Sequence, residues 1–278
     1  MDMPTPLAPA CRVEGCMIAV DVVLQSSDNE LFGAHTKNLE CFNEGFPPAG
    51  WAKKVDEVVV LTESSAVLTL LLGFTHNSLA LPDLEDGDID IDNLLSLCEA
   101  AEKYGNFIAL QACRRGLKNR AKTLDPDGLL KVLRYKVCRF DSTDINDFAR
   151  RTPGIPVKEV WSFYKGYPEV YYLWSRYQIA WAEWDAEFDS AMDINSYPVR
   201  HLNDVRQCPE LDKYLDYFRG SKKVSGIRVT WEVFNSNRMF VNGLPGIKTM
   251  CGCGAFTKWT ANIQKVFERQ PRWEDFTN

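Results

Sequence analysis

The 278-residue chain lacks the features that would place it in a membrane or in the secretory pathway. No segment approaches the roughly 20 consecutive apolar residues that a membrane helix needs. The longest apolar segment, residues 66–74, is too short and contains a threonine. The first residues, MDMPTPLAPACRVEG, have no basic start followed by an apolar block, which a secretory signal requires. We therefore expect a protein of the cytoplasm or nucleus, where disulfides are rare.

The sequence also lacks the motifs of several large enzyme classes. It contains no G-x-x-x-x-G-K-[ST], no G-x-G-x-x-G and no G-x-S-x-G. The acidic segment GDIDID at residues 87–92 is out of register with a calcium-binding EF-hand loop. The net charge of the whole chain is -6, and its basic pairs are isolated, whereas nucleic-acid-binding domains usually carry a basic patch. We predict a protein that is not an enzyme and binds neither nucleic acid nor membrane.

What the sequence does contain is the composition of a globular protein, with 45% hydrophobic and 25% charged residues. Cysteine and tryptophan are frequent, with nine and eight residues, whereas the chain has only three histidines. Residues 1–122 carry a net charge of -8 and the remainder +2, and seven of the eight tryptophans follow residue 160. Together with the turn signal DPDG at 125–128, this indicates a boundary near residues 120–125.

The pattern of the first part predicts a mixture of strands and helices. Residues 17–24 and 30–34 are expected to form a hairpin around a polar turn, and 55–61 a further strand. Residues 64–74, 91–104 and 107–121 have helical spacing, with Ser64 as a possible N-cap and Gly105 between the last two helices. The predicted order is hairpin, short helix, strand, helix, acidic loop and helix pair.

That order and several motifs resemble a BTB/POZ domain, and more closely the divergent BTB-like proteins of basidiomycete fungi. Residues 21–24 (DVVL) occupy the first-strand position of the BTB pattern. Residues 32–35 (FGAH) followed by Leu39 match its F-x-A-H-x-x-x-L signature, and 46–49 (FPPA) are similar to a fungal variant of the next segment. Further matches lie in residues 59–74 and 94–113, so that the resemblance spans roughly residues 15–122.

The resemblance implies an α+β protein, in which a small mixed sheet flanked by helices precedes a mainly helical, Trp-rich C-terminal domain. It also implies a protein–protein interaction module that forms homo- or hetero-oligomers through residues near 15–50. Some BTB proteins are adaptors for a cullin scaffold, and residues 55–57 (VDE) fit the short apolar-x-Glu motif of that contact. The signature and dimer-region residues that it implies are Asp21, Phe32, His35, Leu39 and Phe46.

Four segments are expected from these observations: a flexible N-terminus (1–14), a BTB-like domain (15–122), a helical extension (123–165) and a Trp-rich domain (166–278). His35 is expected to hydrogen-bond main chain at a strand-to-helix junction, because no Cys or carboxylate pattern lies near it in sequence. Asp21 is expected to be a capping or edge carboxylate, not an acid catalyst.

The second part is predicted to be mainly helical. Helices are expected at 129–139, 143–150, 157–164, 204–219 and 256–267, and a strand at 226–234. A longer helix carries aromatic and apolar residues at steps of three and four. They can form either a platform for a ligand or a domain core, and we favour the core. The residues of this face are Val170, Trp174, Tyr177, Trp181, Trp184 and Phe188.

The cysteines are interpreted first as small buried hydrophobic residues. We expect no cofactor, but one zinc alternative remains open in the C-terminal domain, as a zinc-binding protein or an enzyme. Its ligands would be Cys251, Cys253, Cys208 and His201. The C-x-C pair and the gap of seven from His201 to Cys208 depart from the C-x₂₋₄-C spacing of structural zinc sites.

Overall fold

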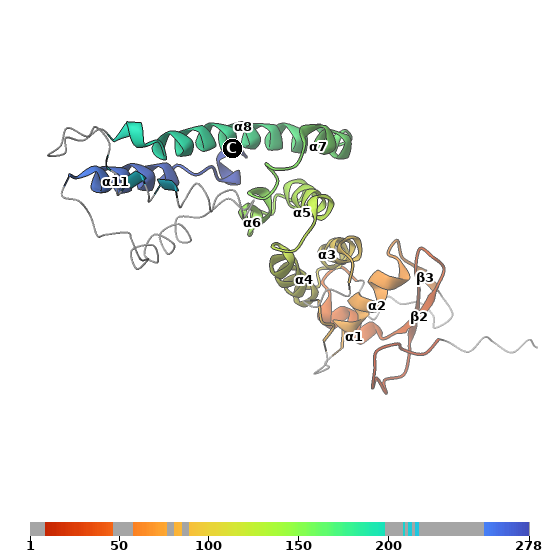
Figure 1. Cartoon of the computed structure of the whole chain (residues 1–278). Helices are drawn as coiled ribbons and strands as arrows, with labels where there is room; N and C mark the ends of the chain where they lie inside the picture. Colours follow the sequence, from red (N-terminus) through yellow and green to blue (C-terminus); the bar gives the residue numbers. More distant parts are fainter. Residues whose placement is uncertain are drawn as a thin grey trace, which may run out of the picture. The chain divides into compact units, whose positions relative to one another are not determined.

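The structure is a computed structural model that describes residues 9–46, 58–76, 81–84, 89–197, 208, 211–212, 215–216 and 253–277. The chain divides into two compact units, Met1–Gly128 and Leu129–Asn278 (Figure 1). A small mixed sheet and several helices form the first unit, and helices form the described part of the second, so the predicted α+β class is confirmed. Among the described residues, no helix has both the length and the apolar composition of a membrane span.

The sheet of the first unit has three short strands, β1 (Val22–Gln25), β2 (Leu31–Ala34) and β3 (Val58–Val60). Their order is β2-β1-β3, with β1 antiparallel to β2 and parallel to β3. The first strand begins at Val22, whereas the sequence predicted a start at Met17. Residues 17–19 are exposed, and the Ala19 carbonyl accepts from the ring of His35 instead of from a neighbouring strand.

The helices of the first unit follow in the predicted order. They are α1 (Thr36–Phe42), α2 (Ser65–Gly73), α3 (Ile91–Tyr104) and α4 (Phe107–Arg120). The predicted cap Ser64 accepts from the Val67 amide, and the predicted break Gly105 has a left-handed φ of 66°. Asp90 of the acidic segment caps α3 by accepting from the Asn93 amide. The buried side of α2 is formed by Val67, Leu68, Leu71 and Leu72.

The second unit contains α5 (Pro126–Cys138), which crosses the boundary, α6 (Ile145–Ala149), α7 (Val157–Tyr164), α8 (Pro168–Ala191) and α11 (Ala255–Glu268). Two 3-10 helices complete the described part, η2 (Ile194–Ser196) and η3 (Trp273–Phe276). The strand predicted at 226–234 lies outside the described residues. Of the helix predicted at 204–219, residues 211–212 and 215–216 are described and are helical.

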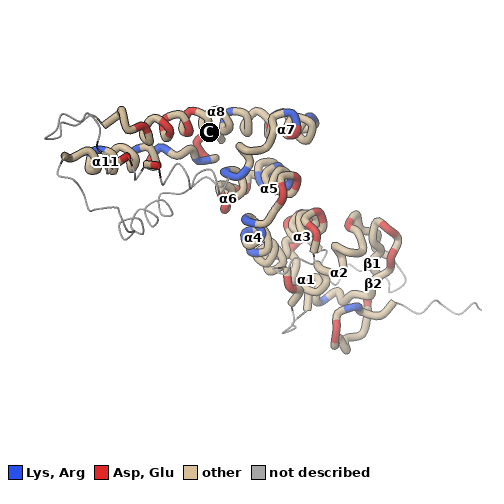
Figure 2. The backbone as a smooth tube through the Cα atoms, viewed as in Figure 1, with Lys and Arg blue, Asp and Glu red and all other residues tan. Residues whose placement is uncertain are grey.

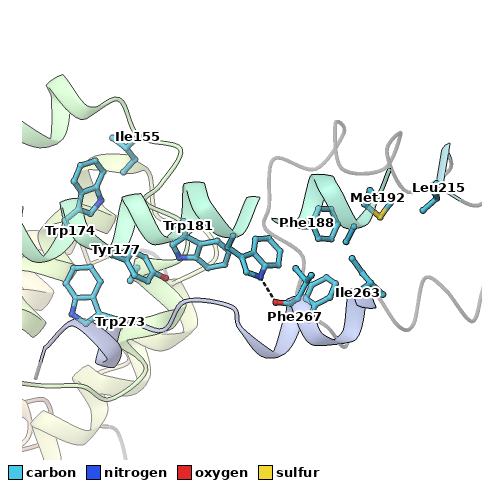
Figure 3. Close-up of a cluster of buried hydrophobic side chains, with 14 of the residues drawn as sticks. Ile155, Trp174, Tyr177, Trp181, Phe188, Met192, Leu215, Ile263, Phe267 and Trp273 are labelled. Atoms are coloured by element: carbon cyan, nitrogen blue, oxygen red, sulfur yellow. Dashed lines mark hydrogen bonds between the residues drawn. The ribbon is translucent and has the colours of Figure 1, made fainter. Parts of the chain in front are cut away.

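The aromatic face of α8 is the core of the second unit, as predicted (Figure 3). All six residues of the predicted face are buried, and they pack with Trp259, Phe267 and Trp273 from the C-terminal end of the chain. The Trp184 indole N–H donates to the Val266 carbonyl at 2.7 Å. Figure 2 shows acidic residues along the C-terminal half of α8, and Glu183, Glu187 and Asp189 among them are exposed.

Two predicted boundaries differ from the structure. The predicted flexible segment 1–14 includes Arg12, whose guanidinium lies 4.1 Å from the centre of the Phe32 ring and pairs with Glu30 at 2.7 Å. The predicted extension 123–165 is not a separate layer, because Leu130 and Tyr164 belong to the same core as the residues of α8. Leu130 packs into that core, and the division between the units falls at Gly128 instead of at residue 122.

A substitution on each side of α8 tests this assignment of its two faces. We expect Trp181→Ala to destabilise the second unit by about 3–5 kcal/mol, because it removes a buried ring that contacts Tyr177 and Trp184. Ile179→Ala is the control: Ile179 is 59% exposed, so a change within about 0.5 kcal/mol is expected. Denaturant unfolding followed by tryptophan fluorescence measures both, since seven of the eight tryptophans lie in this unit. Equal effects of the two substitutions on the free energy of unfolding would contradict the assignment of a buried and an exposed face to α8.

Candidate metal centre

Four potential metal ligands converge in the first unit: Cys11, Cys16, His35 and His76. Their ligand atoms all lie within 4.8 Å of one another. Cys11 Sγ is 3.4 Å from His76 Nε2, and Cys16 Sγ is 3.2 Å from His35 Nε2. The two imidazoles meet edge to face, with ring centres 5.3 Å apart. Two sulfurs and two nitrogens thus surround one point.

His35 is positioned by the junction between β2 and α1. It is the N-cap residue of α1, and its side chain is buried beneath the N-terminal segment, with 2% of its surface exposed. Its Nδ1 lies 2.9 Å from the Ala19 carbonyl oxygen, which can only accept a hydrogen bond. The proton therefore resides on Nδ1, and the lone pair of Nε2 points toward Cys16.

His76 is positioned by the turn that follows α2. Its Nδ1 lies 3.0 Å from the Leu72 carbonyl oxygen, which also accepts from the amide and the hydroxyl of Thr75. The same reasoning as for His35 gives Nδ1 the proton and turns Nε2 toward Cys11. An Nδ1–H bond to a main-chain carbonyl is the arrangement that fixes ligating histidines in metal proteins.

The two cysteines are positioned by one short loop. The Cys16 amide donates to the Val13 carbonyl at 3.1 Å, and Gly15 adopts a left-handed φ of 72° that a side chain would disfavour. Four residues separate Cys11 from Cys16, which is within the C-x₂₋₄-C spacing of structural zinc sites. The loop therefore presents both thiols to the two imidazoles.

The distances suit a tetrahedral ion. With Zn–S near 2.3 Å and Zn–N near 2.0–2.1 Å, the ligands of tetrahedral zinc are about 3.4–3.8 Å apart. The two sulfur–nitrogen distances in the structure, 3.4 and 3.2 Å, lie close to this range. The widest separation in the cluster, at most 4.8 Å, needs an adjustment of about 1 Å, which rotation of a cysteine side chain provides.

The thiols are the exposed half of the cluster. His35 and His76 are 2% and 8% exposed, whereas both cysteines are partly accessible. Burial raises the pKa of the Cys11 thiol, and the nearby Cys16 adds to the rise, while a hydrogen bond with Val13 opposes it. Without an ion this thiol therefore holds its proton. A bound divalent cation favours the thiolate, so that metal binding would release protons.

The structure extends the role predicted for His35. The expected bond from a ring nitrogen to main chain is present, but the other nitrogen faces Cys16, which the sequence distance of 19 residues had concealed. Asp21 has the predicted capping role, since its carboxylate accepts from the amide and the hydroxyl of Thr36 at 2.7 Å. Phe32 and Leu39 are buried, and Phe46 stacks on Tyr104.

The cysteines do not all follow the prediction of small buried residues. Of those described, Cys98, Cys113 and Cys208 are buried, Cys41 and Cys138 are exposed, and Cys253 is intermediate. The alternative zinc set predicted in the C-terminal domain includes His201 and Cys251, which lie outside the described residues. That alternative therefore stays a prediction.

The first unit also contains a small cavity and a hydrogen-bonded carboxylate, Glu63. The cavity, of about 170 Å³, is lined by residues that include Cys11, Phe32 and Leu72, and it is smaller than the roughly 300–1,000 Å³ of small-molecule sites. Glu63 accepts from Lys103 and Tyr104 at 2.8 and 2.7 Å. Burial, with Glu63 adding to it, raises the pKa of Tyr104 to about 12, so its hydroxyl stays a donor in a structural contact.

Neither a scan against protein-family models nor a search of curated proteins finds a match to this chain. The chemistry of the cluster therefore rests on its own geometry.

The main-chain contacts of the two imidazoles predict their tautomers. We expect His35 and His76 both to carry the proton on Nδ1, because carbonyl oxygens of Ala19 and Leu72 face that nitrogen. Long-range proton–nitrogen correlation spectra of the imidazole rings distinguish the two tautomers. A proton on Nε2 of either ring would contradict the proposed orientation of the lone pairs toward the thiols.

Proposed function

We propose that this chain is a zinc-binding protein, in which the ion fastens the N-terminal segment to the sheet and α2 of the first unit. The observation that carries the proposal is the convergence of Cys11, Cys16, His35 and His76, with both imidazoles oriented by main-chain carbonyls. Two thiolates and two imidazoles in tetrahedral arrangement are a donor set typical of zinc. Calcium and magnesium prefer oxygen ligands, which this set does not offer.

The proposed role of the ion is structural. Catalytic zinc sites keep one position for water or substrate, whereas four protein ligands close the tetrahedron. The ligands come from three segments: the loop at 11–16, the β2–α1 junction and the turn after α2. One ion would thus join parts of the chain up to 65 residues apart. Such a cross-link suits a unit whose sheet has strands of only three or four residues.

Metal content of matched variants tests the proposal. We expect about one zinc ion per chain by elemental analysis after purification with added zinc, and a value near zero for Cys11→Ser/Cys16→Ser or His35→Asn/His76→Asn, since two remaining ligands bind zinc weakly. Circular dichroism reports whether each variant remains folded.

The chain offers a control for each variant. Cys251→Ser/Cys253→Ser and His201→Asn alter the same residue types at the site predicted in the C-terminal domain, and should leave the zinc content unchanged. Loss of zinc in these controls but not in the first pair would move the site to the C-terminal domain. A wild-type chain that takes up no zinc would contradict both the site in the first unit and the site predicted in the C-terminal domain.

A second proposed function is the BTB-type interaction module that the sequence resembles. Its specific support is a pair of large apolar side chains at the metal centre: Met17 is 95% exposed and Ile18 is 55% exposed. These two residues form the tip of a short loop. On one side of the tip Cys16 contacts the ring of His35, and on the other side the Ala19 carbonyl does. Two adjacent exposed apolar side chains can contribute to an apolar patch that a protein partner covers. The tip falls within residues 15–50, where self-association is expected.

Self-association through this tip predicts a change in mass on substitution. Met17→Ser/Ile18→Ser should weaken the oligomer on the order of tenfold or more, because each buried apolar side chain contributes about 1.5 kcal/mol or more. Phe140→Ser, which alters an equally exposed side chain in the second unit, should leave the mass unchanged. Size-exclusion chromatography with light scattering over a range of concentrations measures this. A wild-type chain that stays monomeric at high concentration would count against the module.

The proposed cullin adaptor role remains a separate hypothesis. Its motif at residues 55–57 lies outside the described residues, and three-residue matches arise by chance. Binding of a cullin N-terminal domain to the full chain, compared with Glu57→Ala, is the direct assay.

A further inference from the structure

The ligands of the proposed metal centre differ in solvent exposure, and the two cysteines, which can be oxidised, are the more exposed ones. The imidazoles of His35 and His76 are buried, while the sulfurs of Cys11 and Cys16 are partly accessible. A small oxidant arriving from solvent therefore meets the sulfurs first. Thiolates are the form of cysteine that reacts with peroxides, and a bound cation keeps both sulfurs in that form.

The two sulfurs are also close enough to react with each other. They lie within 4.8 Å, on a loop of six residues that the Cys16–Val13 hydrogen bond closes. A disulfide requires a sulfur–sulfur distance near 2.05 Å. Both cysteines are free thiols, and rotation of their side chains would have to supply this approach. Each sulfur has a partner in the cluster for a reversible disulfide, which protects it from irreversible oxidation.

We propose that this centre is a redox switch, in which a hydroperoxide converts Cys11 and Cys16 to a disulfide and releases the zinc ion. The inference rests on the proposed zinc site. It concerns the regulation of that site by oxidation.

The reaction balances with one hydroperoxide. One thiolate attacks the nearer peroxide oxygen, the O–O bond breaks, and the alkoxide or hydroxide that leaves takes up a proton. The sulfenic acid formed is attacked by the second thiolate, a sulfur–sulfur bond forms, and the departing hydroxide becomes water with a second proton. Two sulfurs are oxidised and the peroxide is reduced. With both thiolates consumed, two imidazoles remain, and the zinc ion leaves.

The disulfide would release the N-terminal segment from the rest of the unit. It links two residues of the same loop, whereas the ion joins that loop to the β2–α1 junction and to the turn after α2. The segment covers β2 closely: a Cβ added at Gly33 would collide with the Pro9 carbonyl oxygen and would lie 2.9 Å from the carbonyl carbon of Ala10. Opening of this segment would therefore expose β2 and the ring of Phe32.

Arg12 makes the opening measurable with trypsin. Its side chain is 44% exposed, but its guanidinium pairs with Glu30, donates to the Leu31 carbonyl and lies over Phe32. These contacts must break before Arg12 can enter the specificity pocket of trypsin. Cleavage tracks the population of the open form when opening is fast. We expect hydrogen peroxide to release about one zinc ion per chain, and to speed cleavage after Arg12 on the order of tenfold or more.

The experiment uses the full-length, zinc-loaded chain. Zinc release is followed with a chromogenic chelator, and peptide mass spectrometry locates the disulfide. A Cys11–Cys16 disulfide that dithiothreitol with zinc reverses is the expected product. The variant Cys41→Ser/Cys138→Ser, which removes two exposed cysteines outside the cluster, should respond like the wild type.

The outcomes separate this inference from the zinc site itself. If zinc binds but peroxide does not release it, or if oxidation occurs at other cysteines or only to sulfonate, the switch is wrong and the zinc site stands. If the chain binds no zinc before peroxide is added, the proposed function fails, and the switch fails with it.

Discussion

Two main-chain carbonyls determine which nitrogen of each buried imidazole faces the thiols. The Ala19 and Leu72 oxygens accept from Nδ1 of His35 and His76, which leaves both Nε2 lone pairs directed toward sulfur. Each carbonyl also belongs to a segment that must be in place, the chain before β1 and the end of α2. The geometry of the proposed centre and the packing of the N-terminal segment therefore depend on each other.

The two units differ in how their apolar residues are covered. The second buries a continuous aromatic core along a helix of 24 residues, which supplies a large apolar area. The first has a sheet of very short strands and covers it with a loop that includes Arg12 and the partly exposed Cys11. A bound ion would add a cross-link between this loop, the β2–α1 junction and the turn after α2. It is in this unit that the redox chemistry is proposed.

The sequence predicted what depends on local spacing. The buried face of α8, the cap Ser64 and the break at Gly105 all follow from residues within a few positions of one another. The sequence did not reveal the candidate metal centre, because its cysteine–histidine pairs are 19 and 65 residues apart and meet only after the chain folds. The C-x₄-C pair at 11–16 was a signal that could have found it, but these residues were assigned to a flexible N-terminus. The unexpected start of β1 has the same origin, since the Ala19 carbonyl serves His35.

X-ray absorption at the zinc edge of the zinc-loaded chain tests the central claim most directly, because it reports the identity and distance of the atoms bound to the ion. The account predicts two sulfurs near 2.3 Å and two imidazole nitrogens at about 2.0–2.1 Å. A shell of three or more sulfurs, or one of oxygen and nitrogen alone, would contradict the assignment to Cys11, Cys16, His35 and His76.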